Sequence, residues 1–292
     1  SIVARRGIER LPGLSLANTI EPCPATTLPG SLDGLVAAMP AQHLRQSMAE
    51  LAGLRDVPAL SAAKGIEHGS HLRMTEVLVT LGWREQQVAA ISGPNLAHEI
   101  ARGLPAAAVV ASREEPLAEA WQRALSRPLF RVYRSQDVVG VEFGGALKNV
   151  VAIAAGAATG LDLGANAVAA IMTRGLAEMT RLAVAAGADP LTLQGLAGVG
   201  DLAATCFSPL SRNRRLGELL ATGRSVAEAL AEIGEAVEGA ATAPVVVDLA
   251  ARHSVDMPIA EQVALVLAGR RTVAEAMTEL LQRALKPEAH GT

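Results

Sequence analysis

A single lysine stands at the head of an apolar, helix-like segment of the chain. The segment EFGGALKNVVAIAAGAATG covers residues 142–160, and residues 149–161 carry no charge. On a helix, Lys148 shares one face with Gly145 and Gly156, so another backbone or a ligand can come close. Burial on such a face lowers the pKa of a lysine and suits it to general acid/base catalysis. The alternative is an ammonium group that reaches water from the helix end.

Lys64 and Asp201 are two further candidates. Lys64, in AAKGIE, lies where a strand is predicted to end, either as a solvated loop lysine or as a cation at a sheet edge. Asp201, in AGVGDLAAT, follows a glycine-rich turn. Asp is a good helix N-cap, but a carboxylate here can also orient an ammonium group or a substrate hydroxyl.

The start of another predicted helix gathers positive charge. The stretch SPLSRNRRLGELL places Ser211, Arg212 and Asn213 in the first turn. Free backbone N–H groups, the helix dipole and a guanidinium form an anion site that suits phosphate, although a solvated basic turn has the same composition. No metal-binding set is convincing, because His68 and His71 stand in a loop. Together these residues indicate proton transfer on a phosphorylated substrate.

The first half of the chain alternates short apolar runs with helical patterns. The runs that read as strands are LDGLVAAMP, PALSAAKG, QVAAISGP, PAAAVVAS and LFRVYRS. This alternation predicts a parallel sheet covered by helices on both faces. Ligands bind at the carboxyl ends of such strands, where this sequence has MPAQ, AAKGIE and SGPN.

The second half shows helical patterns and no strands. The predicted helices cover residues 141–158, 166–186, 190–197, 212–221, 226–233, 243–253, 259–268 and 273–285. We therefore expect two domains. Residues 1–138 form a Rossmann-like, doubly wound α/β domain that binds a dinucleotide, and residues 139–292 form an all-α substrate domain.

Composition excludes some classes of protein. Half of the 292 residues are apolar and the net charge is −3, which argues against a nucleic-acid surface. No uncharged run reaches the roughly 20 residues of a membrane span. Two distant cysteines, Cys23 and Cys206, and the absence of a visible signal peptide indicate a reducing, cytoplasmic compartment. The chain opens on Ser1, which suggests a start inside a longer protein.

Taken in order, the motifs resemble one family, the bacterial NAD(P)-dependent glycerol-3-phosphate dehydrogenases. The resemblance runs from about Leu11 to about Leu281 with near-family spacing. The matching segments are LPG, MPAQHLR, AKGIE, ISGPNLAHEIARGLPAAAVVAS, FRVYRSQDVVGVEFGGALKNVVAIAAG, TRGLAEMTRL, GLAGVGDLAATC, SRNRRLG, EAVEG and MPI.

The resemblance implies reversible reduction of dihydroxyacetone phosphate to sn-glycerol 3-phosphate with NADH or NADPH, supplying phospholipid synthesis. It makes Lys148 the catalytic lysine, helped by Asp201 of the GxGD element. Lys64 falls on a lysine shared by substrate and cofactor. Gly93 and Asn95 fall on substrate positions. A homodimer is also implied.

The remaining implied positions concern phosphate and cofactor. Ser211, Arg212 and Asn213 match the substrate-phosphate cluster, and Arg212 also lies near the cofactor. Further cofactor positions fall on Ala97, Ala236 and Glu238.

Departures from the family occur in two places. Asn95 replaces the usual Ser or Thr, and Leu96 replaces a usual Phe. At the front, the family has a strand and a G-x-G-x-x-G turn that holds the cofactor pyrophosphate, and neither opens this sequence. Either residues ahead of Ser1 supply this unit, or the protein lacks its pyrophosphate site.

Two arginines bear on the choice of cofactor. SIVARRG resembles the second strand of the family sheet, with Arg5 and Arg6 just past its end, where a dinucleotide fold meets the adenosine ribose. An arginine suits a 2′-phosphate, so we expect NADPH to be accepted at least as well as NADH. A pair of solvated arginines at a strand end is the alternative.

Two other functions compete with this expectation. A non-catalytic glycerol-phosphate-binding protein is favoured by the missing glycine-rich turn and disfavoured by Lys64, Lys148, Asp201 and Arg212. A dehydrogenase of the same architecture acting on an unphosphorylated hydroxy acid is disfavoured by the SRNRR cluster.

Overall fold

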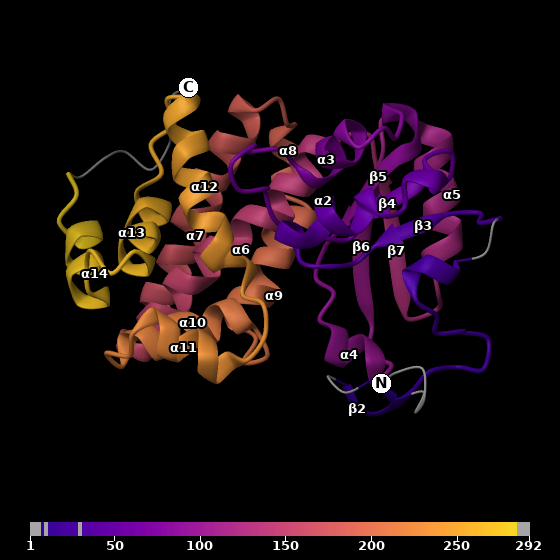
Figure 1. Ribbon diagram of the computed structural model, residues 1–292. Helices are drawn as coiled ribbons and strands as arrows, with labels where there is room; N and C mark the ends of the chain where they lie inside the picture. The colour runs from indigo at the N-terminus through magenta and orange to yellow at the C-terminus, as the bar shows by residue number, and fades with distance from the viewer. Residues whose placement is uncertain (1–6, 9–10, 29–30, 285–292) are drawn as a thin grey trace.

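The computed structural model describes residues 7–8, 11–28 and 31–284. Figure 1 shows two parts side by side: a sheet with its helices, and a bundle of helices. We call residues 31–135 the sheet part and residues 138–284 the helical part. The division into domains at residues 138 and 139 stays a prediction, although β7 ends at Ser135 and α6 begins at Val138.

Five strands form the main sheet in the order β3-β4-β5-β6-β7. Their bounds are β3 (Leu35–Ala37), β4 (Ala59–Ser61), β5 (Val88–Ser92), β6 (Ala106–Ala111) and β7 (Phe130–Ser135). All neighbouring pairs are parallel except β5 and β6, which are antiparallel, so the expectation of a purely parallel sheet is wrong. A parallel crossover must carry the chain back along the whole strand. The only helix in this connection, α4 (Ala97–Ala101), has 5 residues and spans about 7.5 Å, which is too short.

Helices cover both faces of this sheet, as predicted. Alternate residues of a strand point to opposite faces, so Ala59 and Leu60 enter different cores. Ala59 packs with Leu44 of α2 (Ala41–Ala49) and Leu78 of α3 (Met74–Thr80). Leu60 packs with Trp121 of α5 (Glu115–Leu125). The Rossmann-like α/β prediction is therefore confirmed.

The first strands do not join this sheet. β1 (Gly7–Ile8) and β2 (Leu11–Ser15) form a separate antiparallel pair. The strand predicted over SIVARRG, including Arg5 and Arg6, lies outside the described residues except for Gly7.

The helical part contains the helices expected and one more. Their bounds are α6 (Val138–Gly160), α7 (Gly164–Ala185), α8 (Pro190–Leu193), α9 (Asp201–Phe207), α10 (Arg212–Ala221), α11 (Val226–Ile233), α12 (Glu238–Arg252), α13 (Pro258–Leu267) and α14 (Val273–Leu281). The helix predicted over residues 190–197 is wrong beyond Leu193, because α8 ends there and a π-helical turn covers Leu196–Gly200. Helix α9 follows that turn directly. It was not among the predicted helices, because glycines precede it and it has only 7 residues.

Local caps explain where several of these helices begin. The Asp137 carboxylate accepts the Gly140 N–H at the start of α6, and the Ser211 hydroxyl accepts the Arg214 N–H at the start of α10. Ser225 and Thr272 open α11 and α14 with capping boxes. These side chains satisfy backbone donors that have no partner inside the helix.

Helix α6 is the central helix of the protein. By length and composition it could cross a membrane, but 94% of its most apolar window is buried against other elements. It packs against α7, α9, α10 and α12 and also reaches β5. Its apolar surface is therefore the core of the helical part.

Two glycines set the crossing of α6 and α10. A methyl group at Gly156 of α6 would overlap the Arg214 carbonyl, and one at Gly217 of α10 would overlap the Ile153 carbonyl. The two backbones therefore touch without intervening side chains.

We expect Gly156→Ala to destabilise the protein by about 1–3 kcal/mol, because overpacking forces backbones apart. Urea unfolding would measure the change as a lower midpoint. Gly53→Ala is the control, since Gly53 has open space around its α-carbon. Equal midpoints for the two variants would contradict a backbone contact at this crossing.

Candidate active site

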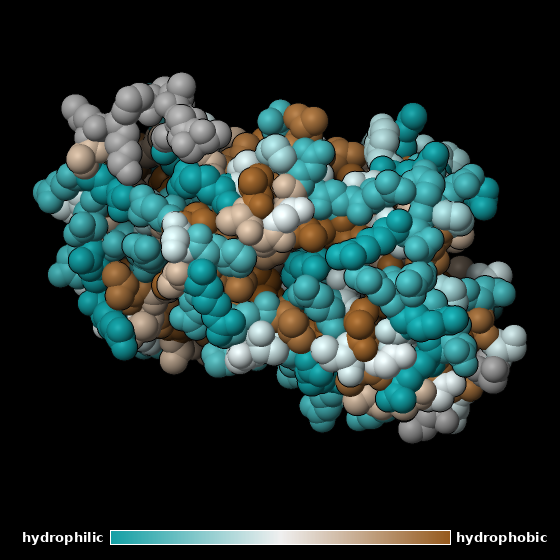
Figure 2. Space-filling view, turned by 90° about the horizontal axis from the view of Figure 1, so that it is seen from above, coloured by the Kyte–Doolittle hydropathy of each residue, from teal (hydrophilic) through white to brown (hydrophobic). Residues whose placement is uncertain are grey.

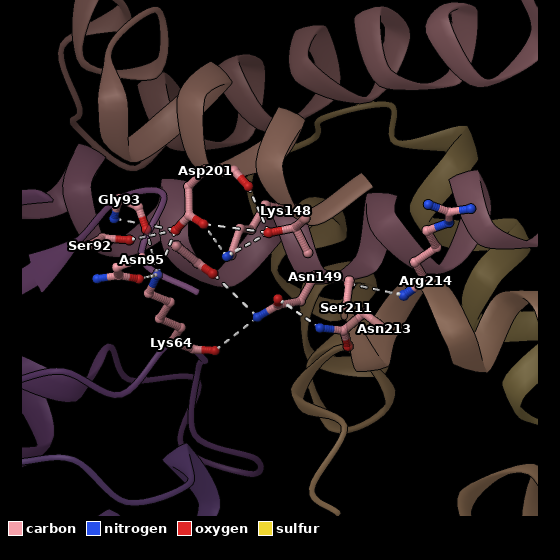
Figure 3. A network of polar contacts seen from close by, with 12 residues as sticks. Lys64, Ser92, Gly93, Asn95, Lys148, Asn149, Asp201, Ser211, Asn213 and Arg214 are labelled. Carbon is pink, nitrogen blue, oxygen red and sulfur yellow. Dashed lines mark hydrogen bonds and ion pairs between the residues drawn. The ribbon is translucent and has the colours of Figure 1, made fainter. Parts of the chain in front are cut away.

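The carboxyl ends of β4 and β5 meet α6 and α9 at one buried carboxylate. Asp201 is the first residue of α9 and is 2% exposed. Lys64 reaches it from the segment after β4, and Lys148 reaches it from α6 (Figure 3). Three candidate residues from distant parts of the sequence therefore form one cluster.

Lys64 is fixed by three acceptors. Its Nζ donates to Asp201 Oδ2 at 2.7 Å, to Asn95 Oδ1 at 2.7 Å and to the Gly93 carbonyl at 2.9 Å. Three acceptors use all the donors of an ammonium group. Gly93 has φ +139°, and a β-carbon there would come within 2.8 Å of Ala108 Cα, so this turn requires glycine.

Lys148 is buried. It is 6% exposed, and its Nζ donates to Asp201 Oδ1 and, at 2.8 Å, to Thr205 Oγ1. Thr205 lies one turn after Asp201 on α9 and donates to the Asp201 carbonyl at 2.7 Å. The desolvated environment expected for Lys148 is therefore correct.

The charges of this cluster shift one another. Burial, together with the nearby Lys64 ammonium, lowers the pKa of Lys148 to about 8. Burial alone would raise the pKa of Asp201, but the two ammonium groups hold that pKa below its ordinary value. Lys148 can thus give or take a proton near neutral pH while Asp201 stays ionised.

A second polar chain runs from this cluster to the start of α10. Asn149 Nδ2 donates to the Lys64 carbonyl at 3.2 Å, and Asn213 Nδ2 donates to Asn149 Oδ1 at 2.9 Å (Figure 3). Asn213 Oδ1 in turn accepts the Gly239 N–H at 2.9 Å. Asn213 is therefore tied to the lysine cluster, and the buried Ser211 lies two residues before it.

The other predicted positions lie at the margin. Arg212 is exposed and pairs with Glu235 at 2.9 Å. Ala97 and Ala236 are exposed, at or just before the starts of α4 and α12. Glu238 Oε1 accepts the Ala41 N–H of α2 at 3.1 Å, which joins the two parts of the protein. Arg5 and Arg6 lie outside the described residues.

Three contact residues were missed in the sequence. Ser92 Oγ lies 3.3 Å from Asp201 Oδ2, Asn149 bridges Lys64 and Asn213, and Thr205 holds Lys148. Thr205 could have been found, since it lies four residues after Asp201 and so on the same helical face. Ser92 and Asn149 carry no such signal, because their partners come from other elements.

One face of the molecule is mostly hydrophilic. Figure 2 shows hydrophilic residues over most of this face, with hydrophobic patches near its middle. The buried cluster itself lies where the two parts of the chain meet, because Lys64 of the sheet part pairs with Asp201 of the helical part.

The chain is similar to known proteins along nearly its whole length. The family model for the NAD-dependent glycerol-3-phosphate dehydrogenase N-terminus matches residues 3–118, and the model for its C-terminus matches residues 137–278. Glycerol-3-phosphate dehydrogenase (NAD(P)+) of Bradyrhizobium diazoefficiens is 47% identical over 289 residues, 98% of this chain and 87% of the relative. That of Thermobifida fusca is 48% identical over 262 residues, 89% of this chain and 78% of the relative.

A solved structure agrees with these matches. The crystal structure of glycerol-3-phosphate dehydrogenase from Coxiella burnetii has a TM-score of 0.91 and 37% identity to this chain. The match covers 97% of this chain and 87% of that one.

We expect Asp201→Asn to destabilise the protein, because the buried Lys148 ammonium and the half-buried Lys64 ammonium lose the carboxylate they share. Breaking a buried ion pair costs about 3–5 kcal/mol. The substitution lowers the pKa of Lys148 further below its unfolded value of 10.5. The folded mutant then binds its proton more weakly than folded wild type, so its deficit is largest at low pH and shrinks as pH rises to about 8, where Lys148 of folded wild type also loses its proton.

Unfolding midpoints of both proteins at pH 6 and pH 9 test this sign. Lys148→Met is the matched control, since it leaves Asp201 paired with Lys64 and should cost less. A deficit of Asp201→Asn that does not change with pH would refute the shared-charge account.

Proposed function

Because the chain belongs to the NAD-dependent glycerol-3-phosphate dehydrogenase family, we propose that the Lys148–Asp201–Lys64 cluster is its catalytic centre. The protein is an oxidoreductase that reduces dihydroxyacetone phosphate to sn-glycerol 3-phosphate with NAD(P)H. The observation that carries the assignment is two lysines on one buried aspartate, at the carboxyl edge of the sheet. General acid/base catalysis needs such a proton donor with a pKa close to the working pH.

Groups at the sheet edge fit the nicotinamide cofactor. Glu238 Oε2 and Thr242 Oγ1 lie 3.2 and 3.5 Å from where a β-carbon on Gly65 would stand. The buried Thr242 hydroxyl has no hydrogen-bond partner among the described residues. A carboxylate and a free hydroxyl can hydrogen-bond ribose and amide groups.

We assign the cofactor to residues around this edge. Lys64 and Glu238 would hold its nicotinamide half. Ala97, Arg212 and Ala236 are further proposed cofactor positions. Arg5 and Arg6 are proposed from the sequence alone, because they lie outside the described residues. When bound, the reduced nicotinamide supplies a hydride to the ketone carbon of the substrate.

Lys148 supplies the proton that balances hydride arrival. Its ammonium group donates to the developing alkoxide oxygen and stabilises the charge there. The pKa of about 8 leaves most of Lys148 protonated at neutral pH, yet makes the proton easier to give than that of an ordinary lysine. In the reverse direction the neutral amine accepts the hydroxyl proton.

Asp201 and Thr205 aim Lys148. Each accepts one hydrogen bond from the Lys148 ammonium group. The third N–H of that group is left for a substrate oxygen. Lys64, with Gly93 and Asn95, would contact the substrate from the sheet part, because these residues surround the same carboxylate. Burial excludes water from the proton transfer.

The start of α10 would hold the phosphate. Ser211 and Asn213 are buried there, and Arg212 lies between them with an exposed guanidinium. A 10-residue helix directs free backbone N–H groups and its positive end at this point. Anchoring the phosphate at α10 would place the ketone of a three-carbon substrate towards Lys148.

Other expectations remain proposals. The unpaired Cys23 and Cys206 accord with a reducing compartment, and we propose the cytoplasm. A homodimer and a role in phospholipid synthesis rest on the family resemblance alone.

We expect Lys148→Ala to lower kcat for dihydroxyacetone phosphate reduction at least about 100-fold, because a positioned acid contributes about 10²–10⁴. Single-turnover kinetics would measure the chemical step, and circular dichroism would check the fold. Near-normal turnover in the mutant would remove Lys148 from the mechanism.

Wild-type reduction should also slow as pH rises through about 8, where the ammonium loses its proton.

We expect Arg212→Ala to raise KM for dihydroxyacetone phosphate at least about tenfold, because a charge-assisted hydrogen bond is lost. Arg215→Ala is the matched control: Arg215 lies on the same helix, is exposed and pairs with Glu232. Steady-state kinetics on both variants, with unphosphorylated dihydroxyacetone as second substrate, would decide. Equal use of the two ketones by wild type would exclude a phosphate site.

A further inference from the structure

Glu142 is a buried carboxylate that the catalytic cluster does not use. It lies on α6, six residues before Lys148, and its side chain is 5% exposed. Its Oε2 accepts from Arg73 Nη1 at 2.7 Å and from Thr75 Oγ1 at 2.6 Å, and its Oε1 accepts the Thr75 N–H at 2.9 Å. Glu142 therefore clamps the start of α3, in the sheet part, onto the central helix of the helical part.

The clamped residues end a hairpin that begins beside Lys64. Ile66 and Arg73 pair as an antiparallel bridge, and the Glu67 N–H donates to the Leu72 carbonyl at 2.9 Å. The ion pair between Glu142 and Arg73 therefore also restrains the position of Ile66, which lies two residues after Lys64. Gly65 between them has no room to adjust, since a β-carbon there would come within 2.6 Å of Ala41 Cβ.

The other strand of this hairpin is anchored on the same helix. Ile66 is 1% exposed and packs in the core of the helical part, in one cluster with Phe143 and Leu147 of α6. Asn149 of α6 also holds the Lys64 carbonyl. Helix α6 thus carries Lys148. It also contacts the hairpin that follows Lys64 on both of its strands, at Ile66 and at Arg73.

We propose that Glu142 is a positioning residue that, through the Arg73 hairpin, sets where the Lys64 ammonium stands relative to Asp201. The proposal rests on the proposed role of Lys64 in the site. The negative charge is needed because Arg73 has a competing partner, Glu76, at 2.8 Å on its more exposed side. Without the Glu142 charge, Arg73 would pair with Glu76 alone and the hairpin would lose its hold on α6.

Lysine-selective NMR tests the position of Lys64 directly. The chain has three lysines, Lys64, Lys148 and Lys286, so protein labelled with ¹³C at lysine Cε gives three signals, assigned with Lys64→Ala and Lys148→Ala. We expect Glu142→Gln to move the Lys64 signal clearly and the Lys148 signal less. Glu76→Gln, which removes the other partner of Arg73, is the matched control and should leave both near their wild-type positions.

Two outcomes of this spectrum would overturn the proposal. One is a Lys64 signal that coincides in Glu142→Gln and wild type. The other is an equal displacement of both lysine signals, which indicates general loosening of α6. If Glu142→Gln does not fold, Thr75→Val removes one donor to the same carboxylate at nearly constant volume, and the same comparison decides.

Affinity for glycerol 3-phosphate separates this proposal from the proposed function. Calorimetry on wild type, Glu142→Gln, Lys64→Ala and the double variant forms a cycle. We expect Glu142→Gln to weaken binding about tenfold in wild type and less than about twofold when Lys64 is absent. An equal loss in both backgrounds would refute action through Lys64. Wild-type affinity in Lys64→Ala would instead refute the proposed role of Lys64, while the NMR comparison still decides the position.

Discussion

One buried carboxylate shared by two ammonium groups is the constraint on which this structure depends. Asp201 is nearly inaccessible, and an isolated charge there would be strongly disfavoured. It is tolerated because Lys64 and Lys148 approach it from different elements. Since these elements belong to the two parts of the chain, the electrostatic requirement is also a requirement on how the parts meet. Lys148 and Asp201 pair within the helical part, but Lys64 can reach this carboxylate only when the sheet part packs against the helical part.

Small residues in α6 make this arrangement possible. A chain with 2% aromatic residues builds its core from Ala, Val, Leu and Gly, so backbones can approach one another closely. A β-carbon at Gly145 would come within 2.5 Å of Ser92 Oγ, which shows how tightly β5 approaches the helix. Such close packing leaves little room for water around Lys148. The depressed pKa of that lysine follows from burial, with the second lysine adding to it.

Much of this could be predicted from the sequence, and the failures have physical causes. Strands and long helices were found because apolar periodicity is a local signal, and the bounds of α10 and α11 were predicted correctly because Ser caps mark their starts. The antiparallel β5–β6 pair was missed because strand direction depends on the path of the connection. Lys64, Lys148 and Asp201 were proposed one by one, but their sharing of charge depends on contacts across 53 and 137 residues. Asn149 and Ser92 could not be found for the same reason.

The glycine crossing of α6 and α10 has a consequence for how this protein can evolve. The α6 and α10 backbones touch main chain on main chain at this crossing, so no side chain there can be trimmed to bring the two helices closer together. If the start of α10 and Lys148 bind the two ends of the substrate, the fixed distance between α6 and α10 limits the length of the molecule that fits between them. Acceptance of a longer substrate would then require a shift of a whole helix, which single substitutions rarely produce. Substitutions can still change the charge and polarity of the side chains between α6 and α10, but not the distance between the two helices.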